Sequence, residues 1–83
     1  MGYMTLNSLM PGEVARVCEL KTKGSMRRRF LDIGLICGTE VECVGKSPMG
    51  DPMAFMIRGA VIAIRSEDCA NILVIKNEET ILN

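Results

Sequence analysis

Histidine and tryptophan are absent from this chain of 83 residues, and aromatic side chains make up only 4% of it. Without histidine, the sequence lacks both the commonest general base and the commonest nitrogen ligand for metals. Its aromatics are Tyr3, Phe30 and Phe55. These are too few to form the stacking platforms on which single-stranded nucleic acids bind. The volume of the core must therefore come from valine, isoleucine, leucine and methionine.

Net charge and long apolar runs are missing as well. Ten basic and ten acidic residues cancel, so the charge balance does not favour nucleic acid or an anionic membrane as a general partner. No apolar run approaches the ~20 residues of a membrane-spanning helix. The first ten residues also lack the basic and apolar regions of a signal peptide. We therefore expect a cytoplasmic protein with no nucleic-acid partner and no direct membrane insertion.

The four cysteines show no CxxC spacing and no secretory signal accompanies them, which favours free thiols in a reducing compartment. Cys43 and Cys69 are expected to be small buried hydrophobes, and Cys37 to be the most exposed. No cofactor is expected with confidence. Weak Fe²⁺ binding stays open as an alternative because carboxylates and thiolates both accept this ion. Its candidate ligands are Cys37, Asp51, Glu67 and Asp68.

Catalytic groups are also lacking. The paired carboxylates at Glu67-Asp68 and Glu78-Glu79 are sequence neighbours, whose side chains point apart in a helix or strand. No glycine-rich phosphate loop is present. Fewer than two groups can be assigned catalytic roles, so we predict that the chain is not an enzyme.

What the sequence does contain is a series of short alternating segments, which predicts a mainly-β fold. Five strands are expected, over Val14–Leu20, Thr39–Lys46, Met53–Arg58, Ala60–Arg65 and Ile72–Lys76. Cys18 falls on the Arg16 face of the first strand unless a bulge shifts the register. Five strands of this length hide their edges best in a small antiparallel barrel. The predicted domain covers residues 6–76, and residues 77–83 form a tail.

A short helix is predicted over Met26–Ile33, after the first strand, with Ser25 as its N-cap. Met26, Phe30 and Ile33 share the face that would cover an open end of the barrel. Arg28 and Asp32 stand four residues apart and are expected to pair. Gly34 suits the end of the helix.

Two further features of the pattern predict local structure. Residues 66–71 form one helical turn that Ser66 caps. The apolar run at Ile62–Ile64 fits a strand that is covered on both sides. For the charged group Arg29, Asp32, Arg58 and Arg65, an ion pair across the barrel and contact with a partner are both open explanations.

Partner binding has two candidate surfaces. The first is an exposed hairpin loop, in which methionines offer adaptable apolar contacts. Its residues are Pro48, Met49, Gly50, Asp51, Pro52 and Met53. The second is the helix, through Arg28 and Arg29.

Several segments, in this order and spacing, resemble the ferrous iron transport protein A family. They are Leu6-x-x-Leu9-x-x-Gly12, Arg29-Phe30-Leu31-Asp32-Ile33-Gly34-Leu35-Ile36-x-Gly38-Thr39-x-Val41, Pro48-x-Gly50-Asp51-Pro52, Arg58-Gly59-x-x-Ile62-Ala63-Ile64-Arg65 and Ala70-x-Ile72-x-Val74. The resemblance covers nearly the whole chain and implies an SH3-like barrel with an added helix.

The resemblance also implies a function. It predicts a small cytoplasmic accessory protein of bacterial ferrous iron uptake that binds and modulates the membrane transporter, ferrous iron transport protein B. That transporter carries a cytoplasmic GTP-binding domain. Two alternatives stay open: an Fe²⁺-binding sensor or chaperone, and an activator of the partner's GTPase through an arginine such as Arg28.

Overall fold

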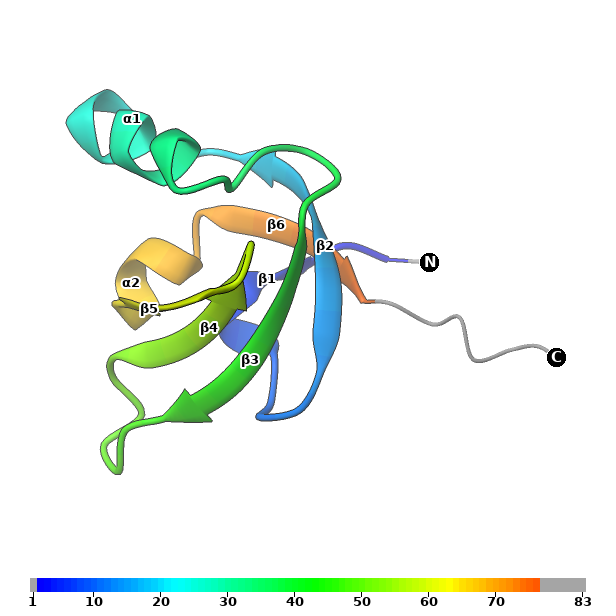
Figure 1. Ribbon diagram of the computed structural model, residues 1–83, viewed down its shortest axis with the longest axis vertical. Helices are drawn as coiled ribbons and strands as arrows, with labels where there is room; N and C mark the ends of the chain where they lie inside the picture. Colours follow the sequence, from blue (N-terminus) through cyan, green and yellow to red (C-terminus); the bar gives the residue numbers. More distant parts are fainter. Residues whose placement is uncertain (1, 77–83) are drawn as a thin grey trace, which may run out of the picture.

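The computed structural model describes residues 2–76 and shows a strongly curved sheet with two helices (Figure 1). The elements, in chain order, are β1 (Met4–Thr5), the 3-10 turn η1 (Leu6–Ser8), β2 (Val14–Leu20), α1 (Gly24–Asp32), β3 (Glu40–Lys46), β4 (Met53–Ile57), β5 (Ala60–Ile64), α2 (Ser66–Cys69) and β6 (Ile72–Lys76). All five predicted strands are present. The additional β1 was not predicted, because two residues are too few for an alternating pattern. The predicted tail, 77–83, lies outside the described residues.

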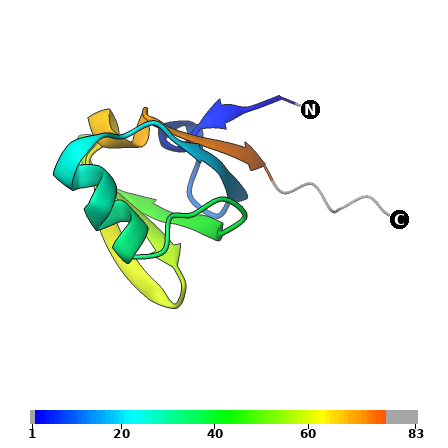
Figure 2. The same cartoon turned by 90° about the horizontal axis from the view of Figure 1, so that it is seen from above.

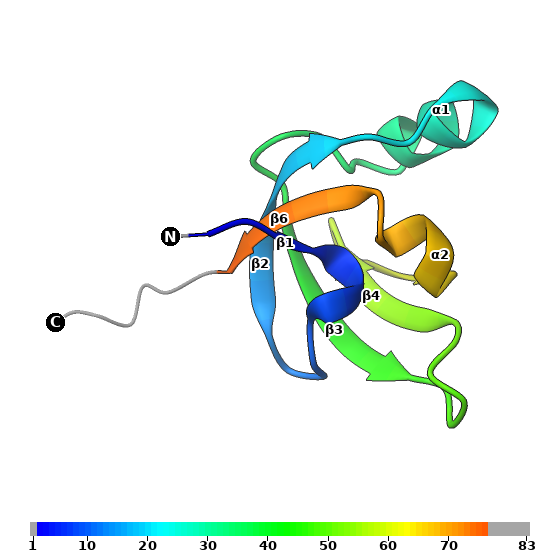
Figure 3. The ribbon, with the colours of Figure 1, turned by 180° about the vertical axis from the view of Figure 1, so that it is seen from behind.

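The sheet has the strand order β1-β6-β2-β3-β4-β5, and every neighbouring pair is antiparallel. The sheet curls round a single core (Figures 1 and 2). Its edge strands are β1 and β5, the first and last in this order. The short helix α2 packs against η1, which follows β1 (Figure 3). This contact helps to close the barrel on the side where the edge strands do not pair with each other. Strand β5 pairs only with β4, so its other edge stays unpaired.

The core consists of the inward-facing side chains of the sheet. Val41 and Cys43 are fully buried, as the alternation predicts, and Phe55 is the largest fully buried side chain. Two bulges adjust the register: one between Val17 and Glu19, and one after Cys43. The first leaves Cys18 without a partner in β6, which allows both Val17 and Leu20 to face inward although they are three residues apart.

Both predicted serine caps are wrong. Helix α1 begins at Gly24, so Ser25 lies inside its first turn, and no side chain caps the helix. In α2, the N–H of Ser66 donates to Oδ1 of Asp51 at 2.8 Å. The capping oxygen therefore comes from the β3–β4 loop and not from the serine.

Helix α1 is held by one buried side chain and one arginine. Phe30 is 4% exposed, and Met26 and Ile33 pack half-buried against the core, which confirms the predicted apolar face. Arg27 donates to the carbonyls of Leu20 and Thr22 at the end of β2. Within residues 2–76, no helix is long and apolar enough to cross a membrane.

The β4–β5 hairpin turns over only two residues. Arg58 and Gly59 have φ values of 50° and 87°, and Ile57 pairs with Ala60 on either side of them. Two positive φ values in a two-residue loop are typical of a type I′ turn. In the strand that follows, Ala63 is exposed, and Val61 on the same face is 61% exposed. The expectation that this apolar strand is covered on both sides is therefore wrong.

Candidate functional site

A groove of about 400 Å³ lies between α1 and β5. Its apolar surface includes Met26 and Ile33 from the helix and Ile62 from the strand, all of which are half-buried. Its polar groups are Arg29, Arg65 and Asp68. An apolar floor with a few charged groups at its rim is typical of a site that binds a peptide segment.

The strand that borders this groove is an unpaired sheet edge. In the antiparallel pairing with β4, Ile57 and Ala60 flank the two-residue turn and form a hydrogen-bonded pair. Because such pairs alternate, the N–H groups of Val61 and Ala63 point away from β4. The strand contains no charged residue and no proline, the usual means of blocking an edge. It therefore offers backbone donors and acceptors to an added strand.

The charge of the groove is more basic than acidic. In the part of the chain that the structure describes, the only ion pair joins Lys76 to Glu13, at 2.5 Å. Arg29 and Arg65 therefore have no ionic partner among those residues. The ion pair across the barrel, one of the two explanations left open for the charged group, is not formed among these residues, and neither is the expected pair between Arg28 and Asp32. Both groove arginines remain open to an external carboxylate.

The β3–β4 loop lies at the opposite end of the molecule from α1 (Figure 1). Ser47 Oγ donates to the carbonyl of Asp51 at 2.6 Å and accepts the N–H of the same residue at 2.8 Å. Met49, at its tip, is 90% exposed. Pro48, Gly50 and Pro52 complete the loop. The two surfaces predicted from the sequence are therefore separate, and a single small segment cannot bind both.

One residue predicted as part of the contact surface is placed elsewhere. Met53 is 1% exposed and belongs to the core, because it is the first inward-facing residue of β4. On the helix, Arg28 and Arg29 are both exposed, but only Arg29 lines the groove. The structure thus separates two arginines that the sequence treats alike.

The candidate metal ligands do not form a metal-binding group, although Asp51 lies beside the helix that carries Glu67 and Asp68. Among residues 2–76 there is no group of three or more His, Cys, Asp or Glu side chains that could hold a metal ion. Cys37 precedes β3 and Asp51 follows it, so they lie near opposite ends of this strand. Glu67 and Asp68 belong to the short α2, and Asp51 caps that helix.

The cysteines lie where the sequence predicts. Cys43 and Cys69 are buried, Cys37 is exposed, and all four are free thiols. Burial, together with the charges of Asp68 and Asp51, raises the pKa of Cys69 to about 12. Its thiol donates to the carbonyl of Ile64 at 3.8 Å and remains protonated at neutral pH. It is therefore not prepared to act as a thiolate ligand.

Sequence reasoning missed the groove itself. Its walls are formed by segments about 30 positions apart, at Met26–Ile33 and Ile62–Arg65. The available signal was the charge-free run Ala60–Ile64 between two arginines. That run is equally typical of a buried strand, so periodicity alone does not distinguish an exposed edge.

Comparison with known proteins gives a consistent result. The family model described as the FeoA domain matches residues 4–76. A curated fusion protein from Porphyromonas gingivalis, Fe(2+) transport protein A/Fe(2+) transporter FeoB, is 31% identical over 71 residues. The match covers 86% of this chain but only 8% of the fusion protein.

Two solved structures show the same fold. The FeoA-like protein from Clostridium acetobutylicum has a TM-score of 0.84 at 30% identity, over 100% of this chain and 96% of the other. Zinc-complexed FeoA from Stenotrophomonas maltophilia, described as a prokaryotic SH3 domain protein, has a TM-score of 0.76 at 27% identity, over 86% and 88% of the two chains. The predicted SH3-like barrel is confirmed, and the chain belongs to the FeoA family.

Proposed function

We propose that this protein is an accessory factor of bacterial ferrous iron uptake that binds the transporter, ferrous iron transport protein B, through the groove between α1 and β5. The observation that carries the partner is the Porphyromonas gingivalis fusion, in which a related domain and the transporter form one polypeptide. Domains that are fused in one organism commonly act together when they are separate chains. Modulation of transport would follow from this binding.

The occupant that fits the groove is an extended, largely apolar segment that carries a carboxylate. The free edge of β5 supplies main-chain hydrogen bonds, as in other proteins that bind a peptide by adding a strand. Met26, Ile33 and Ile62 offer apolar surface for alternate side chains of the segment. Arg29 and Arg65 lie where they can pair with a carboxylate at the rim, which favours one orientation of the segment.

The helix offers a matched pair of variants to test this surface. Arg29→Glu places a negative charge in the groove, whereas Arg28→Glu makes the same change at an exposed position that does not line the groove. We expect Arg29→Glu to weaken binding of the transporter's cytoplasmic domain by about fivefold, a typical value for a rim charge. Arg28→Glu should leave the dissociation constant unchanged in calorimetric titrations at fixed salt.

The remaining outcomes distinguish the surfaces. Equal effects of the two reversals would show general attraction to the helix and not a groove. Binding that neither variant alters, but that Met49→Ala weakens, would assign the contact to the β3–β4 loop. Metal sensing and GTPase activation are not favoured by any arrangement in residues 2–76, and they stay sequence-based predictions.

A further inference from the structure

Cys18 of β2 and Cys37 of the α1–β3 connector are brought together by a bulge at the end of the β2–β3 ladder. The N–H of Val17 donates to the carbonyl of Thr39 at 2.9 Å, and the N–H of Gly38 donates to the carbonyl of Val17 at 2.8 Å. Val17 therefore opposes two residues at once. Cys18 follows Val17 and Cys37 precedes Gly38, so the two cysteines lie next to the same hydrogen bond and line one surface hollow.

The hydrogen bond from Gly38 to Val17 flanks this cysteine pair. Cys37 itself lies in a tight turn, in which the N–H of Thr39 donates to the carbonyl of Ile36 at 3.0 Å. Because the peptide group that follows Cys37 is hydrogen-bonded to the peptide group that precedes Cys18, the two cysteines flank the same hydrogen bond. A disulfide needs Cα atoms roughly 4.4–6.8 Å apart, so a cross-link here joins segments that the backbone already holds together.

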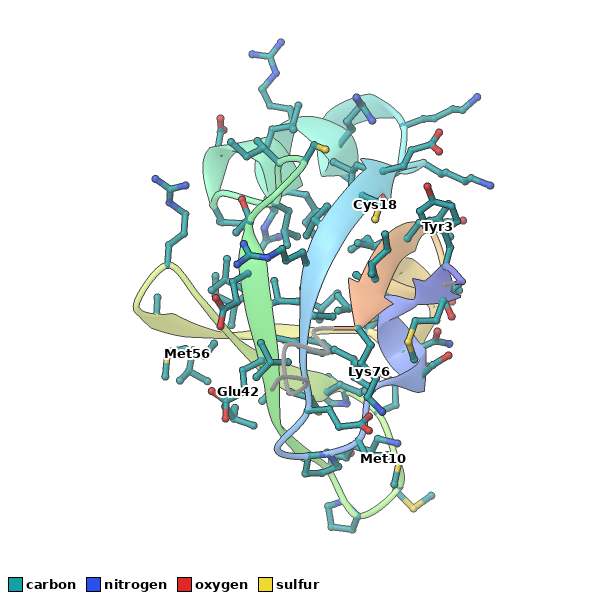
Figure 4. The ribbon with its side chains drawn as sticks, turned by 90° about the vertical axis from the view of Figure 1, so that its right-hand side faces the viewer. Tyr3, Met10, Cys18, Glu42, Met56 and Lys76 are labelled. Atoms are coloured by element: carbon teal, nitrogen blue, oxygen red, sulfur yellow. The ribbon has the colours of Figure 1, made fainter. Side chains whose placement is uncertain are left out.

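The two side chains also share one surface hollow, whose other walls include Tyr3 and Ile75. Cys18 and Tyr3 lie on the same side of the molecule in Figure 4. Cys37 is exposed and Cys18 is half-buried, so a small molecule reaches Cys37 first. Burial, and to a lesser extent the neighbouring Cys37, raises the pKa of Cys18. A pair that binds a soft metal ion needs two thiolates, which this environment disfavours.

The other two cysteines have no such access. Cys43 and Cys69 are each 0% exposed. The Cys43 thiol donates to the carbonyl of Gly45, as that of Cys69 does to the carbonyl of Ile64. Oxidation of the folded protein by a small molecule should therefore leave both unchanged.

We infer that Cys18 and Cys37 form a thiol–disulfide site that a low-molecular-weight disulfide oxidises reversibly. The Cys37 thiolate attacks one sulfur of the small disulfide, forms a mixed disulfide and releases one small thiol. Cys18 then loses its proton, attacks Cys37 Sγ and releases the second small thiol. The two protein thiols are oxidised by two electrons and the small disulfide is reduced to two thiols. The cross-link pins the connector that follows α1 to β2.

The test is equilibration of the full chain with oxidised and reduced glutathione, followed by acid quench, alkylation and mass spectrometry. We expect loss of two hydrogen atoms, retention of two alkylatable thiols after denaturation, and a peptide that joins Cys18 to Cys37. Cys18→Ala removes the resolving thiol and should raise the glutathione adduct on Cys37 at least about tenfold, because the intramolecular reaction no longer competes. Excess dithiol should restore the reduced protein.

Two controls keep the result specific. Cys43→Ala should behave as the unaltered chain, and Cys37→Ser, at an exposed position, should fold but form no cross-link. A glutathione adduct on Cys37 that is equally abundant with and without Cys18 would overturn the inference, as would a cross-link to Cys43 or Cys69. Because the readout is chemical, this outcome is independent of whether the chain binds a transporter.

Discussion

At the scale of single residues, Gly34 is the only glycine in residues 2–76 at which an added Cβ would lie within 4 Å of another part of the chain, the side chain of Arg58. Gly34 is buried and has a φ of 105°, in the region that favours glycine. A Cβ added there would lie 2.1 Å from Cδ of Arg58. Arg58 itself has a φ of 50°, in the β4–β5 turn. One pair of residues thus connects the exit of α1 to the hairpin that carries the groove.

Gly34→Ala should destabilise the protein for two reasons. The left-handed backbone costs about 1–2 kcal/mol for alanine, and displacement of Arg58 adds a further contribution. Gly12→Ala is the matched control, because Gly12 has a φ of 95° and open space at the Cβ position. In urea unfolding, we expect Gly34→Ala to lose more stability than Gly12→Ala.

The double variant Gly34→Ala/Arg58→Ala isolates the second reason. Removing the arginine side chain should recover the excess cost of Gly34→Ala relative to Gly12→Ala, and leave the backbone cost in place. If the double variant shows purely additive losses, Arg58 does not restrict Gly34 and the account of this contact is wrong.

Cys69 predicts a loss of stability in alkali. Its folded pKa, about 12, is raised above the ordinary value of 9.0. Above pH 9 the unfolded chain releases this proton while the folded chain keeps it. The free energy of unfolding therefore falls as pH rises from 9 to 12, by at most about 1.4 kcal/mol per pH unit. Below pH 9 the thiol is protonated in both the folded and the unfolded chain, so this loss of stability does not occur.

The control for this prediction is Cys69→Ala, measured by urea unfolding over the same pH range. The variant loses packing but also loses the titrating thiol, so its decline with pH should be shallower than that of the unaltered chain. Parallel curves for the two proteins would show that other groups cause the alkaline loss.

At the scale of elements, α1 depends on a single deeply buried side chain. Phe30 is the only residue of this helix that is almost fully buried. Phe30→Ala should cost about 3–5 kcal/mol, and Phe30→Leu should cost less because it keeps most of the volume. Leu31→Ala, at a position that is 39% exposed, should be nearly neutral. Chemical denaturation monitored by circular dichroism measures the stability of all three variants. Equal losses in Phe30→Ala and Leu31→Ala would contradict this packing.

The β3–β4 loop is tied to α2 through Asp51. Asp51→Ala removes the oxygen that accepts the Ser66 N–H, and should cost about 0.5–2 kcal/mol, as the loss of an N-cap does. Asp51→Asn keeps an acceptor and should lose less. Hydrogen exchange of the Ser66 amide is the direct readout, and unchanged protection in Asp51→Ala would contradict the cap.

At the scale of the whole molecule, strand number and core were largely predictable because alternating apolar residues report burial directly. Val41, Cys43 and Phe30 occupy the positions that their periodicity indicates. The misassigned cap at Ser66 has a different origin. Its acceptor, Asp51, is 15 positions away, and no local pattern reports it.

The groove shows the same limitation on a larger scale. Its position depends on how α1 folds back towards β5, and no local pattern records that the edge of β5 stays uncovered. Arg28 and Arg29 are chemically identical neighbours, and only the packing of Phe30 decides which of them faces the groove. The groove had to be taken from the structure.

Binding of the transporter in the groove between α1 and β5 can be measured by amide NMR of the isotope-labelled chain during titration with the cytoplasmic GTP-binding domain of its transporter. We predict shifts concentrated on Met26–Ile33 and Ala60–Arg65, reduced in Arg29→Glu and retained in Arg28→Glu. Shifts confined to the Pro48–Pro52 loop, or no shifts at sub-millimolar concentration, would contradict binding in the groove.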